Sequence, residues 1–394
     1  MTIAGEATLQ QSTASRRPSL AYVALASLVA ALLWLRWGGI RKGIWVDLDV
    51  YARGANALIH HEPLYDVSVH GLPFTYPPFA ALLFVPLELF GDVGARWALT
   101  LASLGSYALV VVVCARRLGM NPAIAGTVAL LGLAFEPFLR NILLGQVNLF
   151  LLALVVVDCL VVPARYRGVL IGIAAGVKLL PGAFIFFLVL KREWWAVGRA
   201  IAAFAVTVAV GAVFAPHDSW LFWRGGFVNL SRFGPEAIIG GDNQSLSAAF
   251  MRLSHDLTPP LILVLVMSVG VMALGLVAAK RQIDFGDEIN ALVCIGFASL
   301  LASPVSWTHH WVWAVLALLV LVQDRRWVAG ALLAAVFVIG PMWFAPRGQL
   351  LELRHNWWQV IACLSYVLVG LAYLISFALN RRPGRSSGVG PGSA

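Results

Sequence analysis

The chain has 394 residues, of which 60% are hydrophobic and only 12% are charged, and its mean hydropathy is +0.84. Soluble domains carry charge on roughly 25% of their residues, so this composition excludes an ordinary soluble protein. The net charge of +9 arises from short basic clusters at the ends of apolar runs. Such clusters are typical of topology signals in membrane proteins and do not indicate a nucleic-acid-binding surface.

Long apolar runs predict the fold class. A transmembrane helix needs roughly 20 apolar residues, and backbone groups in lipid must be hydrogen-bonded within their own segment. The runs therefore predict an all-α integral membrane protein with one polytopic domain over residues 19–380, between disordered cytoplasmic segments at 1–18 and 381–394. About twelve spans are expected, at 20–37, 77–91, 97–114, 122–138, 146–163, 168–190, 198–215, 260–279, 289–304, 310–323, 327–343 and 357–379.

An even number of spans places both termini in the cytoplasm. This count also puts two arginine pairs outside, against the positive-inside rule. The run 168–190 contains Lys178 and Pro181, so it has a second interpretation as a broken or re-entrant helix with Lys178 at its tip. Both interpretations of the segment between 77 and 190 stay open. The loops then expected in the periplasm are 38–76, 216–259 and 344–356.

Two acids follow the first span almost at once. Asp47 and Asp49 lie beside Tyr51, and the pattern from 48 to 59 predicts a short helix at the membrane interface. A carboxylate just outside the bilayer faces water and can act as a base, whereas helix capping is the alternative. Two acids beside an aromatic residue favour function. The loop ends at Tyr76, which precedes two prolines and is expected at the mouth of the second span. Tyr51 and Tyr76 are the candidates of this loop for binding the sugar or the acceptor.

Adjacent histidines between two apolar runs form a second constellation. His309 and His310 follow Trp307 in the short turn before the run 310–323. Histidine can relay protons or, when protonated, bind phosphate, and an indole face can stack on a sugar. The alternative is an aromatic belt at the membrane interface. The histidine pair favours function, with Trp307 as a sugar-binding candidate.

The predicted loop 216–259 carries a third set of polar residues. Its amides and guanidinium groups are hydrogen-bond donors of the kind that sugar hydroxyls and phosphates need. A solvated loop is the alternative. The candidates for binding sugar are Asn243 and Gln244, and those for binding phosphate are Arg224, Arg232 and Arg252.

Lys178 stands within an apolar stretch, where a lysine is costly unless it reaches the interface or pairs with an anion. A lipid-linked phosphate is one such partner. Upstream, Gln146 and Asn148 place two amides at the start of another apolar run. Capping of that helix is an equally good explanation for them.

In their order along the chain, these motifs resemble glycosyltransferase family 87. That family comprises polyprenyl-phosphate-mannose-dependent mannosyltransferases with the GT-C membrane fold. No single motif decides the resemblance, but together they cover residues from about 20 to 380. The motifs are Asp47-Leu48-Asp49-Val50-Tyr51, Phe74-Thr75-Tyr76-Pro77-Pro78-Phe79, Gly145-Gln146-Val147-Asn148, Lys178-Leu179-Leu180-Pro181, Asn243-Gln244-Ser245 and the run 303–310.

The resemblance implies transfer of mannose with inversion from polyprenyl-phosphate-β-mannose to a phosphatidylinositol mannoside, giving an α-(1→2) linkage in the periplasm. It is greatest to members that add a fifth mannose to phosphatidylinositol tetramannoside, with α-(1→2) branching of lipomannan or lipoarabinomannan as the alternative. The family's D-x-x-V-Y acid, its expected base, aligns with Asp47, and Asp49 occupies the second variable position. His309 and His310 are the other catalytic candidates. Inverting transfer needs one base and cations for the departing phosphate.

Two other classes of protein remain possible on the sequence alone. A transporter or lipid flippase could use the same intramembrane lysine and histidines as a substrate path. A non-catalytic membrane scaffold is the third possibility. The concentration of polar and aromatic residues in two long outer loops favours the enzyme. Neither the four cysteines nor the acids have the spacing of a metal site, so we expect no metal and no other cofactor.

Overall fold

The computed structural model describes residues 45–66, 68–226 and 229–379. This part of the chain is built almost entirely of helices, with one antiparallel pair of two-residue strands, β1 (Ser68–Val69) and β2 (Leu72–Pro73). The predicted span 20–37 and the two predicted tails, 1–18 and 381–394, lie outside the described residues.

The acidic segment forms the expected interfacial helix, α2 (Val46–Ile59), which begins two residues earlier than predicted. Its two acids stand in the first turn, where negative charge is favoured by the helix dipole. The opposite face is apolar and buried against α3 (Pro78–Glu88). α3 starts on a proline, whose missing N–H costs nothing in a first turn. Tyr76 is buried at this start, as the sequence predicts.

Among the described residues, three helices are long and apolar enough to cross a bilayer: α4 (Gly91–Arg117), α10 (Trp194–Phe214) and α14 (Leu261–Asp284). Only 33%, 17% and 17% of their most apolar windows is buried inside the protein. Apolar side chains therefore cover their outer surfaces, as expected of helices that face lipid rather than water.

Two further helix pairs in the described part of the chain are long and apolar enough to cross a bilayer when taken together, but each pair is sharply bent. α5 (Pro122–Leu133) and α6 (Glu136–Leu144) meet at 55°, and α18 (Trp357–Cys363) and α19 (Ser365–Leu379) at 63°. The straight helix expected over 122–138 therefore bends near its end and continues to Leu144. The backbone of Phe135 is extended, and Pro137 then opens a new helix because it has no N–H to continue the old one.

The run 168–190 breaks at Lys178. α8 (Val169–Val177) ends there, the lysine backbone is extended (φ −150°, ψ 129°), and η1 (Leu180–Phe184) leads into α9 (Ile185–Leu190). The broken-helix interpretation is therefore confirmed, and Pro181 gives the reason. With three to five full-length spans among the described residues, the total of twelve stays a prediction. The remaining helices are α7 (Asn148–Leu160), α11 (Pro216–Trp223), η3 (Leu230–Phe233), α12 (Gly234–Ile239), α13 (Leu246–Ser254), α15 (Glu288–Ala302), η4 (Thr308–Trp313), α16 (Ala314–Gln323), α17 (Trp327–Ile339), η5 (Pro341–Phe344) and η6 (Leu351–Arg354).

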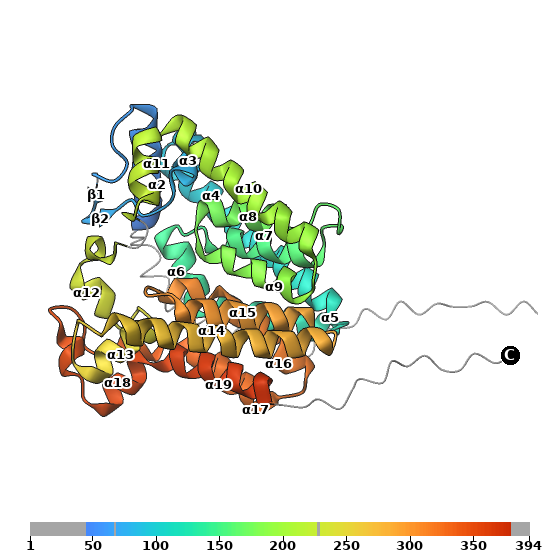
Figure 1. The fold of residues 1–394 in the computed structure, drawn as a ribbon. Coiled ribbons are helices and arrows are strands. Elements are labelled where there is room, and N and C mark those ends of the chain that lie inside the picture. The colour runs from blue at the N-terminus through green and yellow to red at the C-terminus, as the bar shows by residue number, and fades with distance from the viewer. Residues whose placement is uncertain (1–44, 67, 227–228, 380–394) are drawn as a thin grey trace, which may run out of the picture.

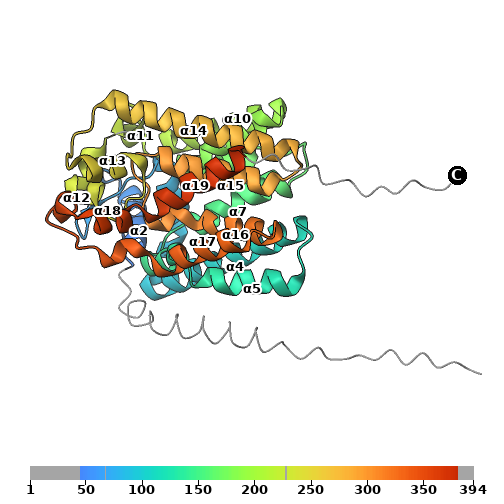
Figure 2. The ribbon, with the colours of Figure 1, turned by 90° about the horizontal axis from the view of Figure 1, so that it is seen from below.

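The helices are arranged around α15, which is apolar on all sides and almost completely buried. Figure 2 shows α15 and α19 between α14 on one side and α16 with α17 on the other. A smaller hydrophobic cluster surrounds α2 and α3. In Figure 1 the short elements α2, α11, α12, α13 and α18 gather at one end of the long helices. The three predicted periplasmic loops thus contribute to the same end of the protein.

Candidate active site

The motifs singled out in the sequence converge where four elements meet. These elements are the first turn of α2, the start of α7, the break after α8, and the 3-10 helix η4. Each brings a polar side chain from a different stretch of the chain into one buried cluster, and helix ends or breaks supply all of them. Irregular backbone at membrane depth is tolerated where it lines a cavity, which fits this placement.

Asp47 is half-buried in the first turn of α2 and is hydrogen-bonded to Gln146. Burial raises its pKa above the ordinary value, and the hydrogen bond with Gln146 and the charges of Lys178 and Arg140 act against that rise. Asp49 points elsewhere. Its carboxylate lies 3.1 Å from His70 Nε2 and is 35% exposed. The structure therefore separates the two acids and places Asp47 alone in the cluster.

Two tyrosines form the wall beside Asp47. The hydroxyl groups of Tyr51 and Tyr76 lie 2.8 Å apart, and Tyr51 also donates to Gln146 Oε1 at 3.0 Å. Tyr51 has no exposed surface, which its hydrogen-bonded hydroxyl makes possible. The two predicted sugar-binding tyrosines thus contact each other, and Tyr51 is bonded to Gln146, which in turn contacts Asp47.

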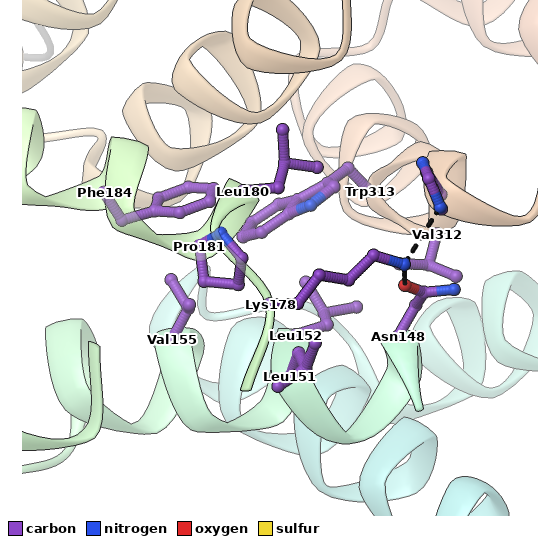
Figure 3. A pocket seen from close by; sticks show the side chains of 11 residues that line it. Asn148, Leu151, Leu152, Val155, Lys178, Leu180, Pro181, Phe184, Val312 and Trp313 are labelled. Atoms are coloured by element: carbon purple, nitrogen blue, oxygen red, sulfur yellow. Dashed lines mark hydrogen bonds between the residues drawn. The ribbon is translucent and has the colours of Figure 1, made fainter. Parts of the chain in front are cut away.

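Lys178 completes the cluster from the helix break. Its Nζ donates to Asn148 Oδ1 at 2.9 Å and lies 3.0 Å from His310 Nε2 (Figure 3). Asn148 donates in turn to Gln146 Oε1 at 3.1 Å. Neither amide caps α7, whose N-cap residue is Val147 without a side-chain bond. The capping explanation for the two amides is therefore wrong, and both belong to the polar cluster.

His309 and His310 lie side by side, with ring centroids 4.6 Å apart. Both are buried, and neither ring nitrogen of His309 has a hydrogen-bond partner among the described residues. The turn that carries them is fixed by Asn141, which donates to the His309 carbonyl at 2.7 Å. His310 thus faces Lys178, while His309 keeps two unused polar atoms in the interior.

A cavity of about 500 Å³ opens beside this cluster. Its wall includes Lys178, His310 and Tyr76 together with Arg232 and Trp307, and most of the remaining wall is apolar. A mostly apolar cavity with a few convergent polar groups is the usual form of a ligand site. The combination suits a hydrocarbon chain that ends in a charged group.

The other predicted binding residues have different surroundings. The Arg252 guanidinium has no exposed surface and donates to three backbone carbonyls near α13 and one, that of Cys363, at the end of α18. Asn243 and Gln244 are equally buried and bond to backbone groups, and Asn243 pairs with Trp307 in a β-bridge. Arg224 is exposed, with its guanidinium 5.9 Å from the Trp220 ring centroid.

Sequence reasoning missed a buried acid behind the histidine turn. Glu136 accepts hydrogen bonds from Thr308 Oγ1, Trp343 Nε1 and Tyr366 OH at 2.8–2.9 Å. It therefore ties α6 to η4, η5 and α19. A charged residue followed by a proline, within the apolar run 122–138, was the signal that could have found it.

Metal binding has no support within residues 45–66, 68–226 and 229–379, where no three His, Cys, Asp or Glu side chains are grouped so as to hold an ion. The four cysteines are buried and form no disulfide bond with one another. The arrangement can supply a carboxylate base, a lysine beside a histidine, and an apolar cavity.

Comparison with known proteins agrees with these features. The model of glycosyltransferase family 87 matches residues 74–304. A polyprenol-phosphate-mannose-dependent α-(1-2)-phosphatidylinositol mannoside mannosyltransferase of Mycobacterium tuberculosis is 34% identical over 369 residues, 85% of this chain and 84% of the relative. The enzyme of the same name in Mycolicibacterium smegmatis is 32% identical over 89% of this chain and 88% of its own length.

A second pair of relatives carries a different acceptor in its name. A polyprenol-phosphate-mannose-dependent α-(1-2)-phosphatidylinositol pentamannoside mannosyltransferase of Mycobacterium tuberculosis is 32% identical over 86% of this chain and 82% of the relative. No solved structure matches the chain significantly. The resemblance seen in the sequence motifs is thus confirmed.

Proposed function

The chain belongs to glycosyltransferase family 87, and we propose that it transfers mannose from polyprenyl-phosphate-mannose to a phosphatidylinositol mannoside with an α-(1→2) linkage. The single observation that carries this proposal is the meeting of Asp47 with Lys178 and His310 beside a largely apolar cavity. A base, a cationic group and a place for a lipid tail are the three parts that this reaction needs.

Asp47 is the proposed base. It takes the proton from the acceptor hydroxyl as that oxygen forms a bond to the anomeric carbon of mannose. The bond to the phosphate oxygen breaks on the opposite face, so a β-linked donor gives an α-linked product. Gln146 holds the carboxylate in place through their hydrogen bond, and Tyr51 orients Gln146 in turn.

Lys178 and His310 are proposed to bind the phosphate of the donor. Lys178 as an ammonium group stabilises the negative charge that develops on the departing phosphate. Arg232 is the second cation we propose for this role because it lines the same cavity, whereas Arg224 and Arg252 do not. Tyr76 and Trp307, also in the cavity wall, are proposed to contact the donor sugar.

Three of the predicted binding residues are proposed to support the site without contacting the substrate: Asn243, Gln244 and Arg252. The Asn243 side chain bonds to backbone groups of the turn 303–308, whereas Gln244 and Arg252 both donate to the carbonyl of Cys363. These side chains therefore support the backbone around the cavity rather than touch sugar. In the same proposal the chain is a GT-C bundle of about twelve transmembrane helices in the plasma membrane, with this site facing the periplasm.

Cysteine labelling tests the orientation. We expect His60→Cys, after α2, and Glu236→Cys, in α12, to react with an impermeant thiol reagent in intact cells, since both positions are exposed at the end that holds the site. Asp284→Cys, at the far end of α14, is the matched control and should react only after the membrane is permeabilised. The native cysteines are buried and should stay silent. Protection of the first two variants would overturn the proposed orientation.

Transfer in a defined system tests the function itself. Purified protein in liposomes is supplied with radiolabelled polyprenyl-phosphate-mannose and phosphatidylinositol tetramannoside. An enzyme yields a new glycolipid with one more labelled mannose, whereas a flippase moves the labelled donor without making a new bond. Parallel reactions with phosphatidylinositol pentamannoside, the acceptor in the names of the second pair of relatives, decide which of the two acceptors this protein prefers. Movement of donor without any new glycolipid would contradict the proposal.

A further inference from the structure

Arg140 on α6 is a confined cation with unused hydrogen-bond donors. Its side chain is 23% exposed and makes no hydrogen bond within the described part of the chain. Its closest charged partners, Glu136 Oε1 and Asp242 Oδ2, both lie 3.9 Å away, too far for a hydrogen bond. The guanidinium is held instead above the ring of Trp343, 4.9 Å from the centroid. The Nε donor is buried and has no partner, which costs free energy, so this side chain is suited to bind a ligand.

Asp242 faces Arg140 and is hydrogen-bonded to the turn that carries His309 and His310. Its carboxylate is 31% exposed, and its backbone carbonyl accepts from the Thr308 amide at 2.9 Å. Asn141, the neighbour of Arg140, bonds to the carbonyl of His309. The segments that carry the guanidinium and the carboxylate are therefore both hydrogen-bonded to the turn that carries the two histidines.

These two groups lie apart from the cavity proposed for the donor. Neither is part of the cavity wall that contains Lys178 and His310. Both cations act on Asp47, since the charges of Lys178 and Arg140 each lower its pKa. Asp47 is therefore within the electrostatic reach of a lysine that lines the donor cavity and of an arginine outside it. In an inverting transfer the acceptor oxygen attacks from the face opposite the departing phosphate, so groups that bind the acceptor are expected outside the donor cavity, as Arg140 and Asp242 are.

We propose that Arg140 and Asp242 form an acceptor subsite that binds two neighbouring hydroxyl groups of the terminal mannose of the acceptor. This inference rests on the proposed function and adds the residues that select the acceptor. The guanidinium donates to one hydroxyl oxygen, and the carboxylate accepts from the next hydroxyl along the ring. Two carboxylates, those of Asp242 and Glu136, flank Arg140, and they would repel a phosphate while leaving a neutral diol unaffected.

Two-substrate kinetics with phosphatidylinositol tetramannoside test the subsite. For Arg140→Met and Asp242→Asn we expect KM for the acceptor to rise about 10- to 100-fold, the equivalent of one hydrogen bond to a charged group, while KM for the donor stays unchanged. Arg140→Lys should recover part of the acceptor affinity, because it restores the charge without the fork of donors. Asp242→Asn keeps shape and volume, so it remains informative even if Arg140→Met folds poorly.

Arg347→Met is the matched control. This arginine stacks on the same Trp343 ring, 4.6 Å from its centroid, but is exposed to solvent, and we expect both KM values to stay at wild type. An unchanged KM for the acceptor in the Arg140 and Asp242 variants would overturn the subsite, as would an equal rise in KM for donor and acceptor. The proposed function would still hold in either case, provided that the wild-type protein transfers mannose. Wild-type protein that transfers no mannose to the glycolipid would overturn the function and, with it, this inference.

Discussion

Replacing Asp47 with asparagine is expected to lower kcat by about 10²- to 10⁴-fold, the usual contribution of a general base. Asparagine keeps the shape of the side chain and can still bond to Gln146, so folding and expression should be preserved. Initial rates of mannose transfer at saturating donor and acceptor measure the loss. The expected loss lies in kcat because the proton is transferred only on the way to the transition state.

Asp49→Asn is the matched control, two residues along the same helix. Its carboxylate faces His70 at the surface, so we expect most of the activity to remain. A larger loss from Asp49→Asn than from Asp47→Asn would move the base by two residues. Full activity in both variants would mean that no acid of α2 serves as the base.

The dependence of the transfer rate on pH tests the role of Asp47 independently. A base works only when it is deprotonated, so transfer should fall as the pH drops through the pKa of Asp47. Burial raises that pKa above the ordinary aspartate value, so the fall should occur at a higher pH than for a solvated aspartate. In Asp47→Asn the residual rate should lose this acid limb. If the rate of the variant still falls at low pH as in the wild type, the fall must be due to another titrating group.

The sequence was most informative where a polar residue interrupted an apolar run. Lys178 could be singled out because a lysine there needs a partner, and the proline three residues later predicted the break that places it. Asp47 stood out for the same reason, at the edge of the first predicted span. In both cases the cost of a charge near lipid singled out a residue that the structure places in the buried polar cluster.

Partners that come from distant elements could not be predicted. Nothing in the chain indicates that the amide of Thr308 bonds to the carbonyl of Asp242, or that Arg140 stops 3.9 Å short of two carboxylates. The dense polar run at Asn243 and Gln244 was interpreted as a binding surface because its residue types suit sugars. The structure gives these side chains backbone partners instead, and side-chain type alone does not distinguish the two uses.

Helix length was the weakest guide to the membrane architecture. The predicted spans assumed straight helices, whereas α5 with α6 and α18 with α19 are bent and several apolar helices are short. A break is cheap wherever a side chain, a second helix or a proline satisfies the freed backbone groups, and sequence does not show which of these is present. The positions of apolar runs were therefore predicted better than their number as complete spans.

Loss of Lys178 is expected to slow the chemical step more than it weakens donor binding. The departing polyprenyl phosphate carries more negative charge than the donor does, so a neighbouring cation stabilises the transition state more than the ground state. Lys178→Met should therefore lower kcat and kcat/KM together, by about 10²- to 10³-fold. The change removes the charge but keeps an unbranched side chain of similar length, so the cavity wall is preserved.

His310→Ala should reproduce part of that loss, because Nε2 lies 3.0 Å from the lysine Nζ and fixes its direction. Lys280→Met, which removes an exposed lysine at the far end of α14, is the control and should leave the kinetics unchanged. A steady-state series over donor concentration separates the possibilities. A rise in KM alone would mean that Lys178 holds the phosphate equally in both states, and wild-type kcat in both variants would leave Arg232 as the cation that meets the departing charge.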